Sequence, residues 1–260
     1  MNNITIKLMG GLGNYLFQIA AGYAFSLKHN YSFRINNIEE SYVAHNPPSL
    51  YINSILPSKI FGNDNISYVT YDEPSFNYNE IPNINRNLKL NGYFQSEKYF
   101  INYRNEIYDL FLNKKIIDDL KLKYKNILNP NTCSLHVRRG DYLRLQEYHT
   151  VLPLSYYKSA IDIIGNDKTF LIFSDDIDWC KEVFDYLPNK IFIEGNADYE
   201  DLFLMSLCND NIIANSSFSW WGAWLNLNPN KIVISPKKWF GKLNIQHKTD
   251  DLYCENWIKL

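Results

Sequence analysis

The sequence has no charge excess of either sign. Its 26 lysines and arginines are balanced by 28 aspartates and glutamates, which gives a formal net charge of −2 over 260 residues. A domain that binds nucleic acid through its phosphates is expected to be clearly basic. We therefore expect no nucleic-acid partner, and a local pair of arginines must serve a small, local anion.

Cysteines and long apolar runs are also scarce. The four cysteines, at positions 133, 180, 208 and 254, lack the spacing of zinc ligands or of a redox pair, so we expect no metal site from them. No run of about 18 apolar residues appears, and the N-terminus lacks the basic and then apolar regions of a signal peptide. We expect a cytoplasmic protein and leave peripheral attachment to a membrane open.

A dinucleotide-binding fingerprint is missing as well. The strand-like "ITIKLM" is followed by the loop "GGLGN", and "YLFQIAAGYAFSLKHN" then places apolar residues at helical spacing. Leu16 stands where the pattern G-x-G-x-x-G requires its third glycine. The opening unit is therefore predicted to be strand, glycine loop and helix, without a dinucleotide site of that type.

The rest of the chain predicts two lobes of different regularity. From Asn36 to about Phe100, short apolar runs such as "ISYVTY" and "LKLNGYF" alternate with turn signals, which predicts an irregular segment with functional loops. Helix-like runs then lead to "NPN", where we place the lobe boundary, so that the lobes are residues 1–129 and 130–260.

The C-terminal lobe alternates strand-like and helix-like runs. This alternation predicts βαβ units and a parallel sheet. The runs, in order, are "CSLHV", "LSYYKSAIDII", "TFLIFS", "IDWCKEVFDYL", "KIFIEG", "YEDLFLMSLC", "NIIAN", "SWWGAWLNL" and "KIVISP".

The stretch "SLHVRRGDY", Ser134 to Tyr142, places two adjacent arginines at the end of a buried strand. His136 and Arg138 share one face by the period of two, and the arginines emerge at the carboxyl end, where open α/β sheets bind ligands. Each guanidinium offers a planar fork of donors, so Arg138 and Arg139 together suit a diphosphate. The alternative is that the pair forms salt bridges with surface aspartates.

A second cluster, "FLIFSDDIDWCKEVF", brings Ser174, Asp175 and Asp176 to a strand-to-helix junction. Carboxylates at a helix start cap its free N–H groups and stabilise it by about 0.5–2 kcal/mol. We rank this capping role first, hydrogen bonding to a ligand second and binding of a divalent metal third. The metal is last because two arginines that face a diphosphate reduce the need for a cation.

A third cluster lies in "IIANSSFSWWGAWLN". Its asparagine and serines fall at the start of a helix, where free N–H groups and hydroxyls form a ready anion site. The alternative role is again N-capping, and the tryptophans at helical spacing are expected in the core. Since all three clusters follow strands of one parallel sheet, we expect them to meet at a single crevice.

These blocks also carry a family resemblance. In chain order they are "GGLGNYLFQIAAGYA", "NGYFQSEKYF", "HVRRGDY" with "VLPLSYYKSAI", "FSDDIDWCKEVF" and "MSLCNDNIIANSSFSWWGAWLN". The chain resembles glycosyltransferase family 11, the α-1,2-fucosyltransferase group, over nearly its whole length. Tyr15 departs from the pattern, because the family usually has glutamine at this position.

The resemblance implies an α/β protein of the GT-B type, in which two Rossmann-like lobes with parallel sheets face a central cleft. It implies an inverting transfer of L-fucose from GDP-fucose to a galactoside hydroxyl in α-1,2 linkage. It also implies that the transfer requires no cofactor and no metal. The acceptor is a galactose-containing glycan, and whether it is lipid-linked stays open, as does the oligomeric state.

Site residues follow from the resemblance by position. The donor-binding residues are Gly11, Gly13 and Asn14 in the N-terminal lobe and His136, Arg138, Asp175, Asp176, Asn215, Ser216, Ser217, Phe218 and Ser219 in the C-terminal lobe. The catalytic residues are Arg138, Arg139, Asp141 and Glu147. The arginines would stabilise charge on the departing phosphate. Asp141 and Glu147 are alternative general bases, and Asp141 has the further alternative of orienting an arginine.

Two other functions remain open from the sequence. One is another GDP-sugar glycosyltransferase of the same fold. The other is a non-catalytic glycan-binding module, because 16% of the residues are aromatic and rings can stack on sugars. Helical spacing of the tryptophans favours a core role over sugar stacking.

Overall fold

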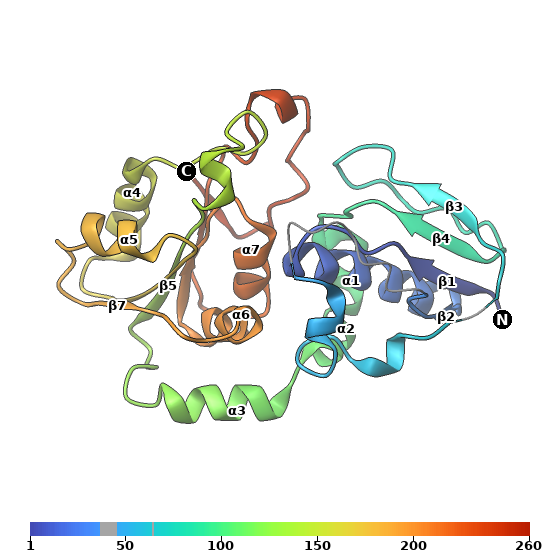
Figure 1. Cartoon of the computed structure of the whole chain (residues 1–260), viewed down its shortest axis with the longest axis horizontal. Helices are drawn as coiled ribbons and strands as arrows, with labels where there is room; N and C mark the ends of the chain where they lie inside the picture. Colours follow the sequence, from blue (N-terminus) through green and yellow to red (C-terminus); the bar gives the residue numbers. More distant parts are fainter. Residues whose placement is uncertain (37–45, 64) are drawn as a thin grey trace. The chain divides into compact units, whose positions relative to one another are not determined.

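The structure is a computed structural model that describes residues 1–36, 46–63 and 65–260 (Figure 1). The chain divides into two compact units. Unit 1 comprises residues 1–113 and 247–254, and unit 2 comprises residues 114–246 and 255–260. Each unit contains a parallel sheet with helices, so both units are α/β.

Unit 1 is built on parallel strands in the order β2-β1-β4-β3. In β1, Ile4 pairs with Phe33 of β2 on one side and with Leu88 of β4 on the other. α1 is buried along most of its length because it consists almost entirely of apolar and small residues. The elements are β1 (Asn3–Ile6), α1 (Leu12–His29), β2 (Ser32–Phe33), β3 (Val69–Asp72), β4 (Leu88–Asn91) and α2 (Arg104–Phe111).

α1 begins three residues earlier than the sequence pattern predicts. It starts at Leu12 and not at Tyr15, so Gly13 and Asn14 lie in the first helical turn. The backbone N–H groups of Asn14 and Tyr15 both donate to the carbonyl of Gly11, at 2.9 and 3.1 Å. These bonds close the first turn inside the predicted glycine loop.

The segment between Asn36 and Phe100 is irregular, as predicted from its turn signals. Its two apolar runs, "ISYVTY" and "LKLNGYF", supply the short strands β3 and β4. Residues 37–45 and 64 of this segment lie outside the described residues. The 3-10 helices of unit 1 are η1 (Pro48–Tyr51), η2 (Ser58–Ile60), η3 (Glu97–Tyr99) and η4 (Ile101–Tyr103).

Unit 2 carries a parallel sheet in the order β10-β9-β8-β5-β6-β7. β6 and β7 follow β5 on one side and β8 to β10 lie on the other, so the winding direction reverses between β5 and β8. Doubly wound sheets bind ligands at this switch point, outside the carboxyl ends of the strands. The strands are β5 (Thr132–Val137), β6 (Thr169–Ser174), β7 (Lys190–Phe192), β8 (Asp210–Ile212), β9 (Val233–Ser235) and β10 (Ile258–Lys259).

The predicted alternation of strands and helices in unit 2 is confirmed. α4 and β6 have the predicted bounds, whereas α5 ends earlier than predicted and β10 was missed because only two residues form it. The helices are α3 (Lys114–Lys123), α4 (Leu154–Ile164), α5 (Ile177–Val183), α6 (Asp198–Leu207) and α7 (Ser217–Trp224), with the 3-10 helices η5 (Asp141–Leu143) and η6 (Lys242–Asn244).

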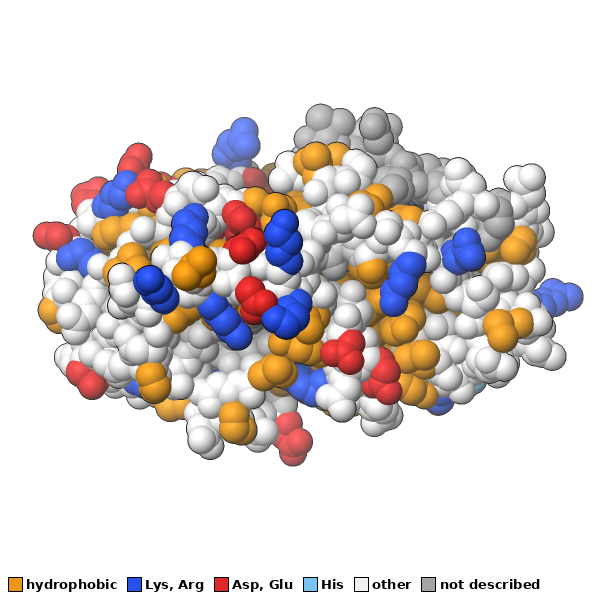
Figure 2. Space-filling model, turned by 90° about the horizontal axis from the view of Figure 1, so that it is seen from below, with side chains coloured by type: hydrophobic (Ala, Val, Ile, Leu, Met, Phe, Trp, Pro, Cys, Tyr) orange, Lys and Arg blue, Asp and Glu red, His pale blue; other side chains and the backbone are white. Residues whose placement is uncertain are grey.

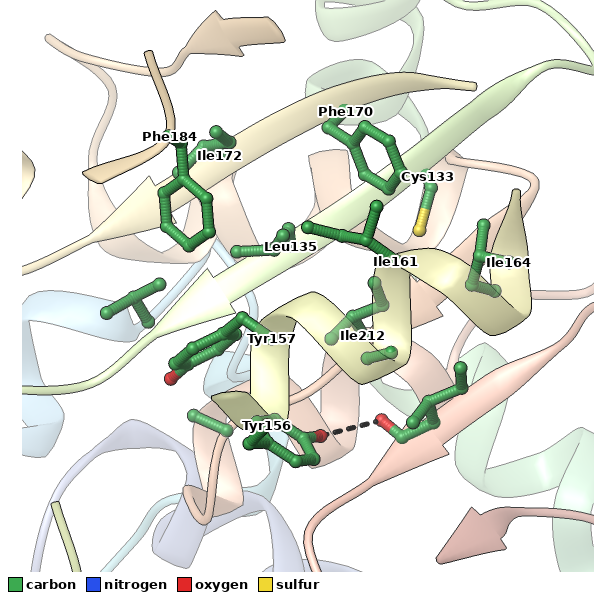
Figure 3. Packing of buried hydrophobic residues seen from close by; sticks show 14 of the residues in the cluster. Cys133, Leu135, Tyr156, Tyr157, Ile161, Ile164, Phe170, Ile172, Phe184 and Ile212 are labelled. Carbon is green, nitrogen blue, oxygen red and sulfur yellow. Dashed lines mark hydrogen bonds between the residues drawn. The ribbon is translucent and has the colours of Figure 1, made fainter. Parts of the chain in front are cut away.

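Helices cover both faces of the unit 2 sheet. α4 and α5 lie on one face, and α6 and α7 lie on the other (Figure 1). Figure 3 shows the first layer, in which Tyr157 and Ile161 of α4 pack over Leu135 of β5. Burying a large apolar side chain contributes roughly 1.5–3 kcal/mol, so this core holds the strand ends in fixed positions.

The boundary between the compact units lies before α3, and the predicted lobe boundary lies after it, at residue 129. α3 packs against α6 of unit 2. At its C-terminal end, Nζ of Lys123, the last helical residue, and Oη of the following Tyr124 lie 2.5 and 3.1 Å from Asn196 Oδ1. These contacts attach the helix to unit 2.

Residues 247–254 belong to unit 1, although the sequence places them in the C-terminal lobe. Asp251 forms an ion pair with Lys98 and accepts the backbone N–H of Tyr78 at 3.1 Å. The chain then returns to unit 2 as β10, where Ile258 pairs with Ile234 of β9. Sequence periodicity does not reveal this excursion because it contains no regular element.

Candidate active site

Three segments that follow neighbouring strands of unit 2 carry most of the predicted site residues. β5 leads into the arginine motif, β6 into Asp175 and Asp176, and β8 into Asn215. β5 pairs in parallel with both β6 and β8, so the three carboxyl ends lie side by side. The predicted meeting of three polar strand ends at one sheet edge is confirmed, and it falls at the switch point of the sheet.

Arg138 is held by two carboxylates. Its Nη2 lies 2.7 Å from Asp141 Oδ1, and its Nη1 lies 2.9 Å from Asp175 Oδ2. The guanidinium also lies over the ring of Tyr142, 5.3 Å from the ring centroid. The side chain is 27% exposed, so its orientation is fixed while part of the guanidinium stays accessible.

Arg139 is fixed by a carboxylate and an aromatic ring. Its Nε donates to Asp176 Oδ2 at 2.9 Å, and its guanidinium stacks 4.0 Å from the ring centroid of Trp179 in α5. The sequence motifs did not predict this role of Trp179, although the residue lies within one helical turn of Asp176.

Both arginines thus form the salt bridges that we considered as the alternative to anion binding. Their partners come from the predicted site and not from unrelated parts of the surface. A guanidinium carries five N–H donors, so these ion pairs orient the two side chains and leave donors for a ligand.

The predicted N-cap role of Asp175 and Asp176 is wrong. α5 begins at Ile177, and Asp176 at the N-cap position makes no side-chain capping bond. Asp175 Oδ1 instead accepts the backbone N–H groups of Arg139 and Gly140 at 2.9 and 3.1 Å. The carboxylates turn toward the arginine motif because bonds to a guanidinium are stronger than bonds to neutral donors. A Cβ on Gly140 would lie 2.6 Å from Asp175 Oδ2, so a larger residue at this position would force the Asp175 carboxylate to shift.

Asn215, three residues beyond the end of β8, has a fixed amide. Its Nδ2 donates to the carbonyls of Thr150 and Trp239, both at 2.8 Å. Because both N–H groups are used, the orientation of the amide is determined, and its buried Oδ1 has no hydrogen-bond partner among the described residues. A buried acceptor without a partner among the described residues is therefore present in the segment that follows β8.

The serines that follow Asn215 begin α7. The backbone N–H of Phe218 donates to Ser216 Oγ at 3.3 Å, which confirms the capping alternative for Ser216. Ser219 is buried, and its Oγ donates to the carbonyl of Ser216 at 3.4 Å. The expected core role of the tryptophans is also confirmed, since at most 1% of each is exposed: Trp220, Trp221 and Trp224.

Tyr142 connects the arginine motif to the β8 end. Its hydroxyl donates to the carbonyl of Asn215 at 3.0 Å, and its ring stacks on His149 with centroids 4.4 Å apart and planes 9° apart. Together with the contact to Arg138, these interactions make Tyr142 a positioning residue. The motif "SLHVRRGDY" contains Tyr142, but its sequence pattern alone does not indicate this role.

His136 is buried at the end of β5 and is 5% exposed. Burial lowers the pKa of His136 to about 4, while Asp175 acts to raise it and Arg138 to lower it. The ring contacts Phe218 with centroids 5.6 Å apart, and Nδ1 has no hydrogen-bond partner within the described parts of the chain. At neutral pH this histidine is uncharged, so the positive charge of the site comes from the arginines.

The two candidate general bases have different surroundings. Asp141 accepts the hydrogen bond from Arg138, which supports the alternative that it orients an arginine. Glu147 lies on an exposed loop, and its backbone carbonyl accepts the N–H of Leu243 at 2.8 Å. The choice between them stays a prediction.

At the carboxyl edge of the unit 1 sheet, amide side chains hold the loops. Gln95 Nε2 donates to Asn14 Oδ1 at 2.7 Å. The buried Gln18 donates from Nε2 to the carbonyls of Met9 and Gly92, both at 3.2 Å, and accepts the N–H of Met9 at 3.1 Å. The glycine loop after β1 is thereby fixed to the loop after β4. The roles of Gln18 and Gln95 were not predicted from the sequence. Both residues lie in blocks that resemble the family, "GGLGNYLFQIAAGYA" and "NGYFQSEKYF", and this position could have indicated them.

Glu73, directly after β3, is a charged residue at this unit 1 edge. Its Oε2 accepts the backbone N–H groups of Tyr93 and Phe94 at 2.7 and 3.1 Å. Burial raises the pKa of Glu73, and these hydrogen bonds oppose the rise. Phe94 has a φ of 52°, an uncommon conformation for a non-glycine residue, and the carboxylate stabilises it.

Tyr15, which departs from the family pattern, is a core residue. It is 1% exposed, and its hydroxyl donates to the carbonyl of Asn46 at 3.2 Å. The roles predicted for Gly11, Gly13 and Asn14 in donor binding stay predictions.

A cavity of about 370 Å³ lies away from these residues. Asn129 and Asn209, which line it, precede β5 and β8, so the cavity is at the amino edge of the sheet. Asn226 Nδ2 and Asn228 Nδ2 donate to protein acceptors there, which leaves these amides engaged. Within residues 1–36, 46–63 and 65–260, no three His, Cys, Asp or Glu side chains are grouped as metal ligands, and no helix is long and apolar enough to cross a membrane.

Sequence comparison identifies relatives of the chain. Residues 1–260 match the profile described as "Glycosyl transferase family 11". The O-antigen biosynthesis glycosyltransferase WbnK of Escherichia coli is 41% identical over 187 residues, which cover 66% of this chain and 60% of that protein. An Escherichia coli α-1,2-colitosyltransferase is 31% identical, with 100% of this chain and 99% of that protein covered. A Bos taurus galactoside α-(1,2)-fucosyltransferase 1 is 27% identical over 53% of this chain and 43% of that protein.

Solved structures share the fold at low sequence identity. The fucosyltransferase NodZ from Bradyrhizobium has a TM-score of 0.55 and 12% identity, with 85% of this chain and 92% of NodZ covered. POFUT1 in complex with GDP has a TM-score of 0.55 and 13% identity, with 90% of this chain and 97% of POFUT1 covered. The predicted fold class, α/β of the GT-B type with parallel sheets, is confirmed.

Proposed function

The chain belongs to glycosyltransferase family 11, and on that premise we propose that it is an inverting fucosyltransferase. The proposed reaction moves L-fucose from GDP-fucose to a hydroxyl of a galactose-containing glycan in α-1,2 linkage. The observation that carries the proposal is the arginine–aspartate cluster at the switch point between β5 and β8. Two oriented guanidiniums beside the start of α7 suit the diphosphate of a nucleotide sugar.

The cluster also suits the chemistry of the transfer. Breaking the bond between sugar and phosphate places negative charge on the departing β-phosphate. Arg138 and Arg139 are already oriented by aspartates, so they stabilise this charge with little reorganisation. Interactions that strengthen as the bond breaks raise turnover and not only affinity. With this charge on the arginines, the proposed transfer needs no divalent metal.

The acceptor hydroxyl must lose its proton during the attack. A positioned carboxylate contributes roughly 10²- to 10⁴-fold to such a step. We favour Glu147, because Asp141 is engaged by Arg138 and suits an orienting role. Glu147→Gln and Asp141→Asn separate the two: a base variant should lose activity toward a hydroxyl acceptor while GDP affinity stays constant, and an orienting variant should lose both.

Colitose is the second candidate sugar, since the colitosyltransferase aligns with the whole chain. Colitose differs from fucose in lacking the 3-hydroxyl group. A site that hydrogen-bonds this hydroxyl rejects the deoxy sugar by about 10⁴-fold, whereas a site that only encloses it discriminates weakly. The ratio of kcat/KM for GDP-fucose and GDP-colitose therefore assigns the donor.

The test combines binding and transfer. Thermal shift with GDP, GDP-fucose, GDP-colitose, GDP-mannose and UDP-galactose should show stabilisation by GDP compounds alone, of about 2.7 kcal/mol at a hundredfold excess over Kd. Transfer from the favoured donor to a β-galactoside should then yield an α-1,2-linked product by NMR. Glycan binding without GDP binding would instead support a glycan-binding module, and transfer of another hexose would support a different GDP-sugar transferase.

A further inference from the structure

Two loops of unit 2 expose large hydrophobic side chains next to each other. One loop follows β5 and spans residues 143–148, and the other follows β9 and spans residues 240–245; we name them together the apolar loop pair. At least two fifths of each side chain is accessible: Leu143 and Leu145 41%, Tyr148 48%, Leu243 53% and Ile245 75%. Single exposed hydrophobic residues are ordinary, but a cluster of five marks an interaction surface.

The two loops of the pair are held together by backbone hydrogen bonds. The backbone N–H of Gly241 donates to the carbonyl of Tyr148 at 2.9 Å, and that of Leu243 donates to the carbonyl of Glu147 at 2.8 Å. A Cβ on Gly241 would lie 2.4 Å from the carbonyl oxygen of Gln146, so the close approach requires glycine. The two loops that carry the exposed side chains are therefore held against each other.

Basic side chains accompany the apolar ones. Arg144 and Lys242 lie within the loops, and Lys237 and Lys238 directly precede the second loop; all four are exposed. Residues 142–149 and 236–246 together contain these four basic residues and one acidic residue, Glu147. The two segments therefore carry a net charge of +3. The whole chain has a net charge of −2, so the positive charge is local.

Another face of the molecule shows how different this composition is. Figure 2 views the molecule from the side of α3, where blue and red side chains are interspersed. On α3, Lys114 and Asp118 form an ion pair, so opposite charges neutralise each other. The apolar loop pair instead combines exposed hydrophobic side chains with an excess of positive charge.

We propose that the apolar loop pair docks on the surface of an anionic lipid bilayer. Aliphatic side chains at loop tips insert at the boundary between headgroups and acyl chains, and flanking lysines and arginines bind anionic headgroups. A protein partner fits less well, because lysine is depleted in protein interfaces and aromatic residues are enriched. Charge complementarity thus selects the membrane as the occupant.

This docking would also serve the site. Both loops follow carboxyl ends of unit 2 strands, the same sheet edge that carries Arg138. If the proposed transferase function holds, an acceptor attached to a lipid would be concentrated near that edge. The docking itself does not depend on the transferase function and can be measured without it.

Co-sedimentation with vesicles tests the proposal on the full chain. The wild-type protein should bind vesicles of equal parts phosphatidylglycerol and phosphatidylcholine more tightly than vesicles of phosphatidylcholine alone. The double variant Leu243→Ser with Ile245→Ser should bind at least about tenfold more weakly, because it removes two inserted side chains. The matched control is Leu122→Ser on α3, which is 67% exposed and should bind like the wild type. Arg144→Gln with Lys242→Gln should lose the preference for phosphatidylglycerol, on the order of fivefold for each charge.

Melting curves and transfer to a soluble acceptor complete the test, and both should be unchanged in the Leu243/Ile245 variant. Several results would overturn the proposal: no binding of wild-type protein to the anionic vesicles, equal binding by the Leu243/Ile245 variant, or an equal loss in Leu122→Ser. Loss of soluble transfer with vesicle binding retained would assign the loops to the acceptor. Self-association that the double variant abolishes, without vesicle binding, would assign them to a second copy of the chain.

Discussion

At the carboxyl edge of the unit 2 sheet, arginines and aspartates hold one another, whereas at the same edge of the unit 1 sheet the amides of Gln18 and Gln95 hold backbone and side-chain groups. Both edges are formed by the carboxyl ends of parallel strands in an α/β unit. We call the unit 2 edge the charged edge and the unit 1 edge the amide edge. At the charged edge, guanidinium donors stay partly accessible. At the amide edge, the side-chain hydrogen bonds fix loops. The difference separates a region where substitutions should affect activity from one where they should affect stability.

The largest effect is expected for Arg138. Arg138→Lys should lose turnover almost as severely as Arg138→Ala, on the order of 10²- to 10³-fold, because lysine keeps the charge but loses the planar two-point grip. Transfer rates with GDP-fucose and melting curves measure the two properties separately. The control is Arg86→Lys, an exposed arginine of unit 1. A fully active Arg138→Lys variant would show that Arg138 is only a structural charge, and loss of activity through unfolding would restore the salt-bridge role.

The amide edge should respond in stability. Gln18→Leu fills a similar volume but leaves the N–H and carbonyl of Met9 and the carbonyl of Gly92 without their partner. Leaving buried polar groups unsatisfied costs about 1–3 kcal/mol each, so unfolding should be easier by several kcal/mol. Urea unfolding beside Gln246→Leu, an exposed control, measures this change. Equal stability of the two variants would mean that water replaces the lost bonds.

The charged edge should also make stability depend on pH. The pKa of His136 in the folded chain, about 4, lies below its ordinary 6.5, so the folded state disfavours the protonated ring. Stability from this residue is complete above pH 6.5 and is lost as the pH falls toward 4, by up to about 3 kcal/mol. Melting temperatures from pH 7 to 4 should fall less steeply for His136→Phe.

A partly buried carboxyl group of unit 2 provides the control for this pH dependence. Burial raises the pKa of Asp201 to about 6, above its ordinary 3.8, so its contribution to stability is lost as the pH rises and has the opposite sign. Asp201→Asn should therefore make the loss of stability in acid steeper. An unchanged slope in His136→Phe would show that other groups cause the pH dependence.

The smallest effect is expected from metal removal. A divalent chelator should leave transfer largely intact, because the arginines of the charged edge supply the positive charge that a metal would bring. Initial rates with and without chelator measure this. Activity that disappears with the chelator and returns with manganese or magnesium would contradict the expectation. It would indicate that Asp175 and Asp176 bind a metal.

Much of unit 2 was predictable because its signals are local. Short, mainly apolar strand-like runs alternate with helix-like runs along the chain, and α4 and β6 were predicted at their observed bounds. The clusters of the site were predictable for the same reason, since each follows a strand directly. The unit boundary was less predictable, because α3 and residues 247–254 are assigned by long-range contacts such as those of Asp251.

By itself, the sequence determined the parallel α/β class, the strand ends that carry charge and the residue types available for a diphosphate, because these depend on periodicity and on neighbours along the chain. Only the tertiary structure decided which partners those residues take. Asp175 could have capped α5, but the fold of the sheet brings β6 beside β5, and the guanidinium and amide groups there bind its carboxylate more strongly than the helix start does. Gln18 and Tyr142 acquired their roles in the same way, through partners many residues away that only the folded sheets bring within hydrogen-bond distance.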